Sequence, residues 1–185
     1  NKDPMETDQV WDEFLKSVER RALQMARIAT SNNEEALDIV QDTMLNLVQK
    51  YRHKPVAELT PLFYRILQSK IRDWYRRQKV RQHWQFLVKS EPGDEDSIYD
   101  PISNAPAPEA DGPNSLLVRN RAMTVLEEAL RQLPMRQQQT FLLRAWEGLS
   151  VAETAAAMRC SEGSVKTHYF RAIHTLRDKL EDHWP

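Results

Sequence analysis

The most informative stretch of this 185-residue sequence runs from Gly148 to Arg171 and reads GLSVAETAAAMRCSEGSVKTHYFR. Ser150 and Glu153 have the spacing of a capping box, in which each side chain hydrogen-bonds the backbone of the other residue at a helix start. The alanines that follow permit close helix packing, and Ser161 can cap a further helix after a short turn. The stretch therefore predicts a helix-turn-helix.

The second helix of this motif has two different faces. Its inward face is expected to include Val165, Tyr169, Ala172, Ile173 and Leu176. Its outward face carries polar and basic side chains: Glu162, Ser164, Lys166, Thr167, His168 and Arg171. This division suits entry into the major groove of duplex DNA, although an ordinary helical hairpin with a solvated polar face is the alternative.

The sequence around the motif is also helical in character. Apolar residues recur at helical spacing from Ala122 to Leu133, Pro134 can open the next helix, and Gly148 can end it. Upstream, at residues 88–115, prolines and carboxylates concentrate and the periodicity is lost. A structureless stretch of this length predicts a flexible linker between two domains.

The N-terminal block predicts three main helices. The first is expected from about Gln9. The second is opened by the capping and acidic residues from Ser31 to Glu35 and runs through about Tyr51, and the third runs from about Leu62 to Arg81. The chain has only four glycines, and helix-favouring residues are abundant. We therefore expect an all-α fold: a helical domain at 8–87, an acidic proline-rich linker at 88–115 and a helix-turn-helix domain at 116–183.

Two surfaces of the N-terminal block indicate binding. In the third helix, cations alternate with aromatic residues around Trp74, and Asp73 is its only acid between Leu62 and Arg81. Cations neutralise phosphates and aromatic faces stack on unpaired bases, so this helix suits nucleic acid, unless Trp74 is simply a core anchor on a solvated helix. In the second helix, four side chains share one face, which suits a protein partner or plain solvation: Asp38, Gln41, Asp42 and Leu45.

No catalytic or metal-binding constellation is recognisable in the sequence. It lacks a glycine-rich phosphate loop, and its single cysteine, Cys160, and five histidines show no metal-ligand spacing. We therefore expect no enzyme activity, no metal and no cofactor. A lone cysteine and the lack of an apolar run near 20 residues lead us to expect a cytoplasmic protein.

These features together resemble the extracytoplasmic-function (ECF) sigma factors over nearly the whole chain. The segment Glu35–Leu45 resembles the helix that docks on the β′ coiled coil of RNA polymerase, which implies core contacts by Asp38, Gln41, Asp42 and Leu45. The segment Leu62–Arg77 resembles the regions that recognise and melt the −10 element, although Leu62 and Ser69 stand where the family usually has Trp and Asn. The −10 contacts implied are Tyr64, Arg65, Lys70, Trp74, Arg76 and Arg77.

The C-terminal block resembles region 4 of the same family, which reads the −35 element. The −35 contacts implied are Ser161, Glu162, Ser164, Lys166, His168 and Arg171. The resemblance also implies three partners: RNA polymerase core through its β′ coiled coil and β flap, promoter DNA, and an anti-sigma factor. Two rivals stay open, a LuxR-type helix-turn-helix regulator and an RNA-binding adaptor that uses mainly Trp74 and its neighbouring arginines.

Overall fold

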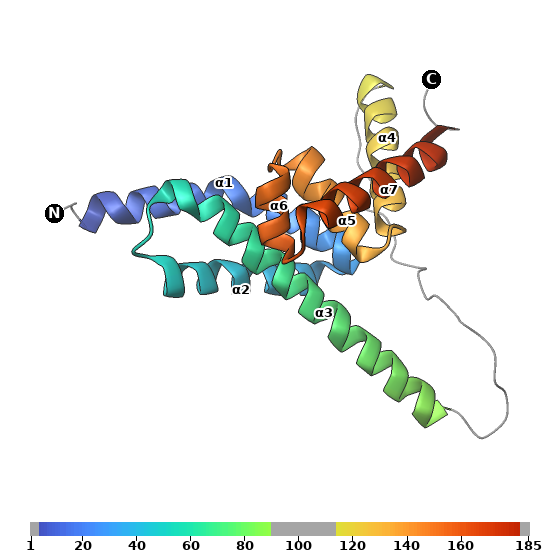
Figure 1. Ribbon diagram of the computed structural model, residues 1–185, viewed down its shortest axis with the longest axis horizontal. Helices are drawn as coiled ribbons and strands as arrows, with labels where there is room; N and C mark the ends of the chain where they lie inside the picture. The colour runs from blue at the N-terminus through green and yellow to red at the C-terminus, as the bar shows by residue number, and fades with distance from the viewer. Residues whose placement is uncertain (1–3, 90–113, 182–185) are drawn as a thin grey trace.

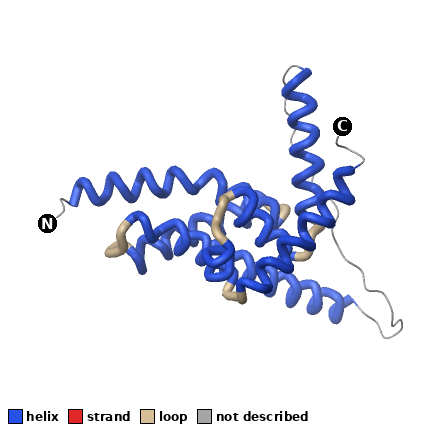
Figure 2. Tube along the Cα trace, turned by 45° about the horizontal axis from the view of Figure 1, so that its top comes forward, coloured by secondary structure: helices blue, strands red, loops and turns tan. Residues whose placement is uncertain are grey.

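The computed structural model describes residues 4–89 and 114–181, and these residues are helical apart from short turns (Figure 2). No strand occurs within them, so the all-helical prediction is confirmed. The linker predicted at 88–115 lies almost wholly outside the described residues.

Three helices form the N-terminal bundle, as the sequence predicts. They are α1 (Pro4–Thr30), α2 (Asn33–Tyr51) and α3 (Leu59–Lys89), with the one-turn 3₁₀ helix η1 (Val56–Glu58) before α3. Asn32 caps α2, since its side-chain oxygen accepts a hydrogen bond from the Glu35 amide at 3.1 Å. α1 and α2 lie side by side, and α3 crosses them (Figure 1).

The core of this bundle is built from apolar stripes at helical spacing. Phe63 and Leu67 of α3 are fully buried, and Phe63 meets Phe14 of α1 edge to face at 6.3 Å between ring centroids. Fully buried Ala22 and Ala26 on α1 remove side-chain bulk from the contact between helices. α3 is longer than expected, beginning at Leu59 and ending at Lys89, so its last turns project from the bundle (Figure 1).

Residues 114–181 form four further helices and a short π-helical segment. These elements are α4 (Asn114–Arg131), α5 (Met135–Phe141), η2 (Leu142–Trp146), α6 (Val151–Met158) and α7 (Glu162–Leu180). Pro134 precedes α5, and Gly148 has φ +70° after η2, so both occupy the positions the sequence predicts for them. The π segment was not expected.

The two halves of the chain pack against each other. α6 lies on α3, and α4 touches α1 (Figure 1). The contact contains buried polar groups: Gln139 Nε2 donates to the backbone oxygen of Gln68 at 3.4 Å, and both side chains are buried. At the periphery, Gln24 Nε2 donates to Glu127 Oε1 at 2.6 Å.

Candidate protein and nucleic-acid interfaces

The acidic face predicted on α2 is a continuous exposed surface. Asp38, Gln41 and Asp42 are exposed, and Leu45 is 59% exposed. The opposite side of the helix packs on α1 and α3 through Ala36, Ile39, Val40, Thr43 and Leu47, which are buried. An exposed leucine between carboxylates and an amide is suited to a protein partner that offers cations around an apolar contact.

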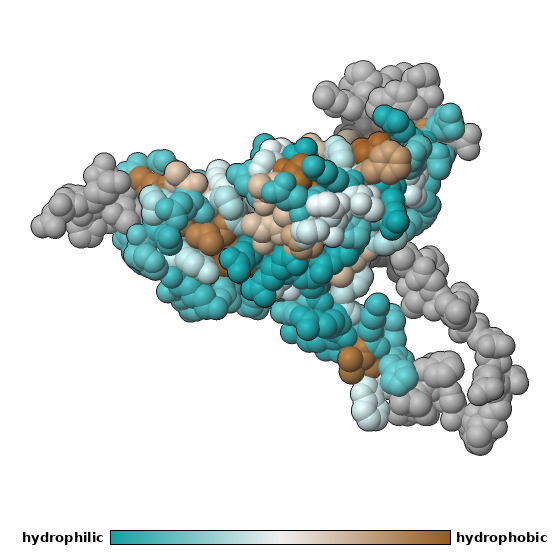
Figure 3. All heavy atoms as spheres, in the orientation of Figure 1, coloured by the Kyte–Doolittle hydropathy of each residue, from teal (hydrophilic) through white to brown (hydrophobic). Residues whose placement is uncertain are grey.

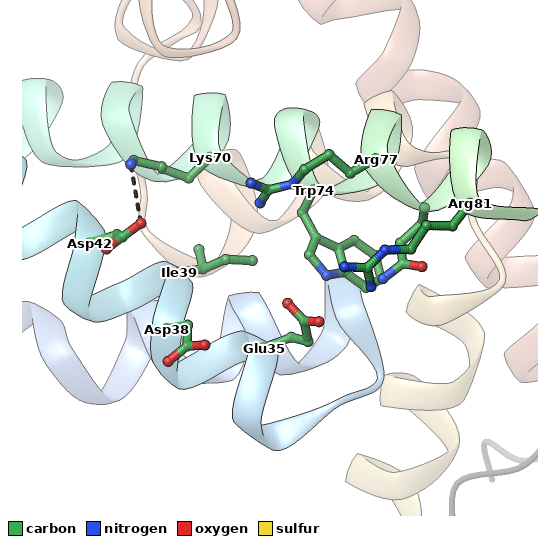
Figure 4. Close-up of a pocket in the computed structure, with 9 residues that line it drawn as sticks. Glu35, Asp38, Ile39, Asp42, Lys70, Trp74, Arg77 and Arg81 are labelled. Atoms are coloured by element: carbon green, nitrogen blue, oxygen red, sulfur yellow. Dashed lines mark hydrogen bonds and ion pairs between the residues drawn. The ribbon is translucent and has the colours of Figure 1, made fainter.

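A polar cleft of about 280 Å³ separates this face from α3 (Figure 4). Across it, Lys70 Nζ lies 3.3 Å from Asp42 Oδ2, while Arg77 and Arg81 project from α3 beside Trp74 (Figure 4). The Trp74 indole is half-buried, and its N–H is buried without a hydrogen-bond partner among the described residues. The predicted acidic and basic surfaces therefore meet at one cleft, which Trp74 lines.

A second cleft, also about 280 Å³, lies between the end of α2 and the start of α3. Four cationic side chains line it, together with a few polar and apolar ones. One of the four, Arg159, comes from the turn between α6 and α7. The lining residues are Asn46, Lys50, Tyr51, Leu62, Arg65, Ile66, Ser69, Lys70, Asp73 and Arg159. The cations are suited to bind a phosphate, and the hollow with its hydroxyl and amide groups is suited to hold an unstacked base.

The six residues predicted to contact −10 DNA occupy different environments. Arg65, Arg76 and Arg77 are exposed, with Arg76 hydrogen-bonded to Asp73, whereas Lys70 and Trp74 are half-buried. Tyr64 is fully buried and packs edge to face on Phe63 at 5.2 Å. Burial raises the pKa of Tyr64 well above its usual value, and the nearby Glu147 carboxylate adds to this effect.

The helix-turn-helix has the caps that its sequence predicts. The Glu153 amide donates to Ser150 Oγ at 3.1 Å, and the Ser150 amide donates to Glu153 Oε2 at 2.7 Å. The backbone amide of Ser150, followed by its side-chain hydroxyl, stabilises the Glu153 carboxylate and so lowers the pKa of Glu153. Arg159 makes the turn with φ 52°, and Ser161 Oγ accepts from the Ser164 amide at 3.1 Å to start α7.

The recognition surface on α7 contains most, but not all, of the predicted side chains. Glu162, Lys166 and Arg171 are exposed, together with Ser161 and Thr167. Ser164 is half-buried, and its hydroxyl is 2.9 Å from that of Ser161, so each satisfies the other. His168 is also half-buried, and burial, followed by the charges of Arg136 and Arg171, lowers its pKa.

One exposed residue of α7 was missed by the sequence analysis. Phe170 is 65% exposed and contacts His174 edge to face at 4.8 Å between ring centroids. It follows Lys166 by one helical turn, so the spacing alone placed it on the outward face. An exposed phenyl ring at this position can contact the methyl group of thymine.

The interface between the halves also contains buried charge. The Glu147 side chain, from the turn after η2, is 5% exposed, and its Oε2 lies 3.6 Å from Arg21 of α1, which is 59% exposed. Nearby, burial lowers the pKa of Arg72 on α3, and the positive charges of Arg136 and Arg159 lower it further. The contact therefore combines one buried carboxylate with three arginines of like charge.

Within residues 4–89 and 114–181, no helix is long and apolar enough to cross a membrane. In the same part of the chain, no three His, Cys, Asp or Glu side chains gather as a metal site would require.

Comparison with known protein families matches both halves of the chain. A model of Sigma-70 region 2 matches residues 11–81, and a model of Sigma-70 region 4 matches residues 123–176. The RNA polymerase sigma-E factor of Streptomyces avermitilis is 25% identical over 172 residues, which cover 92% of this chain and 85% of that protein. The ECF RNA polymerase sigma factor BldN of Streptomyces coelicolor is 40% identical over 70 residues, 38% of this chain but only 26% of BldN.

Solved structures share the fold. The sigma factor RpoE of Bartonella quintana, in complex with the anti-sigma factor NepR, aligns with a TM-score of 0.60 and 22% identity over 93% of this chain and 99% of that chain. CnrH, in complex with the cytosolic domain of CnrY, aligns with a TM-score of 0.56 and 18% identity over 96% of each chain.

Region 2 followed by region 4 on one helical chain defines a transcription initiation factor of the sigma-70 class. The chain belongs to the extracytoplasmic-function sigma factor family.

Proposed function

We propose that this protein binds RNA polymerase core and directs it to promoters with particular −10 and −35 elements. In this scheme α2 holds the β′ coiled coil through Asp38, Gln41, Asp42 and Leu45, while the β flap contacts region 4. The observation that carries the proposal is that three surfaces follow one another along the chain in the same order as in the sigma factor family. They are an exposed acidic face on α2, basic clefts beside α3, and a capped helix-turn-helix.

The two DNA elements would be recognised by different chemistry. The second cleft, with Arg65 and Lys70 at its wall, would accept an unstacked −10 base and its phosphates. On α7, Lys166 and Arg171 would enter the major groove of the −35 duplex, and Phe170 would add an apolar contact. The chain itself would supply binding and positioning, and the polymerase the chemistry.

The proposed domain boundaries are 8–87, 88–115 and 116–183. We further propose that the protein acts in the cytoplasm. We also propose that an anti-sigma factor holds it inactive, since RpoE aligns with this chain in a complex with the anti-sigma factor NepR. A LuxR-type regulator is not favoured, because both halves of the chain match sigma-factor models.

Transcription in vitro with purified core enzyme over a promoter library tests the proposal. Asp42→Ala should weaken core association about tenfold, whereas Lys166→Ala and Arg171→Ala should weaken −35 binding about tenfold and leave core association intact. Glu19→Ala, an exposed acid on α1, and Lys179→Ala, near the end of α7, are the matched controls. The assignments would be contradicted if the wild-type protein did not support promoter-directed initiation. They would also be contradicted if all three variants initiated transcription as the wild-type protein does.

A further inference from the structure

Three arginines from the two halves of the chain gather where α6 lies on α3. Arg72 comes from α3, Arg136 from α5, and Arg159 from the turn between α6 and α7. Burial lowers the pKa of Arg72, and the positive charges of Arg136 and Arg159 lower it further, so both lie close enough to act on the Arg72 guanidinium. These three residues are called the arginine cluster below.

No acidic side chain neutralises the arginine cluster within the described residues. None of its three members forms an ion pair there. Asp73 favours the charged form of Arg72, but its carboxylate is hydrogen-bonded to Arg76, whose own charge opposes that effect. The arginine cluster therefore has an excess of positive charge, which is complementary to an anion.

Arg72 also has an unpaired donor at this position. Its Nη1 is buried and has no hydrogen-bond partner among the described residues. A buried donor without an acceptor costs free energy, and the cost is larger when the donor is charged. Arg136, by contrast, is held in place, because its Nη1 donates to the backbone oxygen of Met158 at 2.8 Å. An oxyanion between these side chains would satisfy Arg72 and neutralise its neighbours.

Arg159 occupies a backbone position that favours glycine. It follows the last residue of α6 with φ 52°, in the left-handed region, where a side chain with a Cβ has a steric cost. Its side chain is exposed, so packing in the core does not account for an arginine here. A charged residue in a strained backbone position indicates that the charge itself has a role.

The second cleft gives a ligand access to the arginine cluster. Arg159 lines this cleft of about 280 Å³, together with Ser69 and Asp73, which lie one turn before Arg72 and directly after it on α3. Three further cations of α2 and α3 line the same cleft, so positive charge continues from the arginine cluster into it. Where α3 emerges beside α6, the visible surface is strongly hydrophilic (Figure 3). The approach therefore suits a small, highly charged anion.

We propose that the arginine cluster binds a small multivalent phosphate anion, and that the bound anion bridges the two halves of the chain. Guanidinium groups bind phosphate oxygens in pairs, so three of them suit a ligand with several such oxygens. The Nη1 of Arg72 is buried where the rigid backbone of a DNA duplex does not reach, so a free anion fits this site. Because the anion contacts both halves, it stabilises their packed arrangement.

Calorimetric titration of the chain with sodium pyrophosphate tests the proposal, with the ionic strength held constant by sodium chloride. Pyrophosphate should bind at a single site, and Arg72→Gln and Arg159→Gly should each weaken this binding about tenfold. Arg159→Gly also relieves the left-handed backbone, so this variant should unfold at no lower urea concentration than the wild type. Lys79→Gln and Arg177→Gln remove exposed cations elsewhere and are the matched controls, which should not change the affinity.

The possible outcomes separate the site from its alternatives. Equal affinity of the wild type, Arg72→Gln and Arg159→Gly would overturn the proposal and show an adventitious ion only. A loss in Arg159→Gly without a loss in Arg72→Gln would place the anion on region 4 alone and overturn the bridge between the halves.

A short duplex of random sequence distinguishes DNA phosphates from a free anion. Its affinity should be the same for the wild type and for Arg72→Gln. An equal loss of duplex and pyrophosphate binding in Arg72→Gln would assign the arginine cluster to the nucleic-acid backbone and overturn the proposal. None of these measurements involves core enzyme or a promoter, so their failure would leave the proposed function unaffected.

Discussion

The buried pair between Arg21 and Glu147 yields a quantitative prediction for how the two halves hold together. Arg21→Ala removes the cation that lies 3.6 Å from a carboxylate that is 5% exposed. Leaving a buried charge unpaired costs about 3–5 kcal/mol. Since Arg21 is 59% exposed, solvent screens the pair, and we expect a cost of about 1–2 kcal/mol.

This loss of stabilisation should increase the fraction of molecules in which the N-terminal and C-terminal halves are separated. A change of about 1–2 kcal/mol corresponds to about 5- to 30-fold in the equilibrium between packed and separated arrangements. Distances between labels at Gln49→Cys on α2 and Asp178→Cys on α7, in a Cys160→Ser background, report this equilibrium; both label sites are exposed. Arg20→Ala, which removes an exposed neighbouring cation, is the control and should not change the distances.

A second variant isolates the physical cause. Adding Glu147→Gln to Arg21→Ala removes the unpaired buried charge, so the double variant should regain most of the packed population. The reasoning is refuted if the double variant is as separated as Arg21→Ala alone. It is equally refuted if Arg21→Ala leaves the distances unchanged.

Two further predictions concern the fold. Ser150→Ala removes the capping box with Glu153 and should lower the free energy of unfolding by about 1 kcal/mol, measured by urea denaturation, while Ser150→Thr should retain most of it. Because burial raises the pKa of Tyr64, its contribution to stability is present below the ordinary tyrosine pKa of about 10 and is lost as pH rises above it. Tyr64→Phe should therefore unfold with a weaker pH dependence above about pH 10, and an unchanged dependence would contradict this assignment.

The local features of the fold follow from short-range sequence signals. Ser150, Glu153 and Ser161 cap helices as predicted, and Gly148 adopts the positive φ expected after a helix. These features depend on residues three or four positions apart, so the sequence alone is sufficient. The prediction stopped α3 near Arg81, but the next residues contain no glycine or proline and the helix continues to Lys89.

Features that depend on contacts between helices far apart in the sequence could not be predicted in the same way. The family resemblance implied that Tyr64 contacts DNA, whereas the structure buries it in the bundle core, where it packs on Phe63. Glu147, which is distant in sequence, adds to the rise in its pKa. Trp74 and Trp84 lie on the same long helix, and the position of α2 beside Trp74 leaves that residue half-buried, whereas Trp84 is exposed. The π segment before Gly148 has no recognised sequence signal.

The arginines at the contact between the halves give this protein a particular response to ionic strength. The positive charges of Arg136 and Arg159 repel that of Arg72 where α6 lies on α3, and dissolved ions weaken this repulsion. The same ions compete with the protein for DNA phosphates. Dissolved ions likewise weaken the attraction between Arg21 and Glu147, so salt acts in opposite directions on the contact between the halves and in a single direction, toward release, on bound DNA.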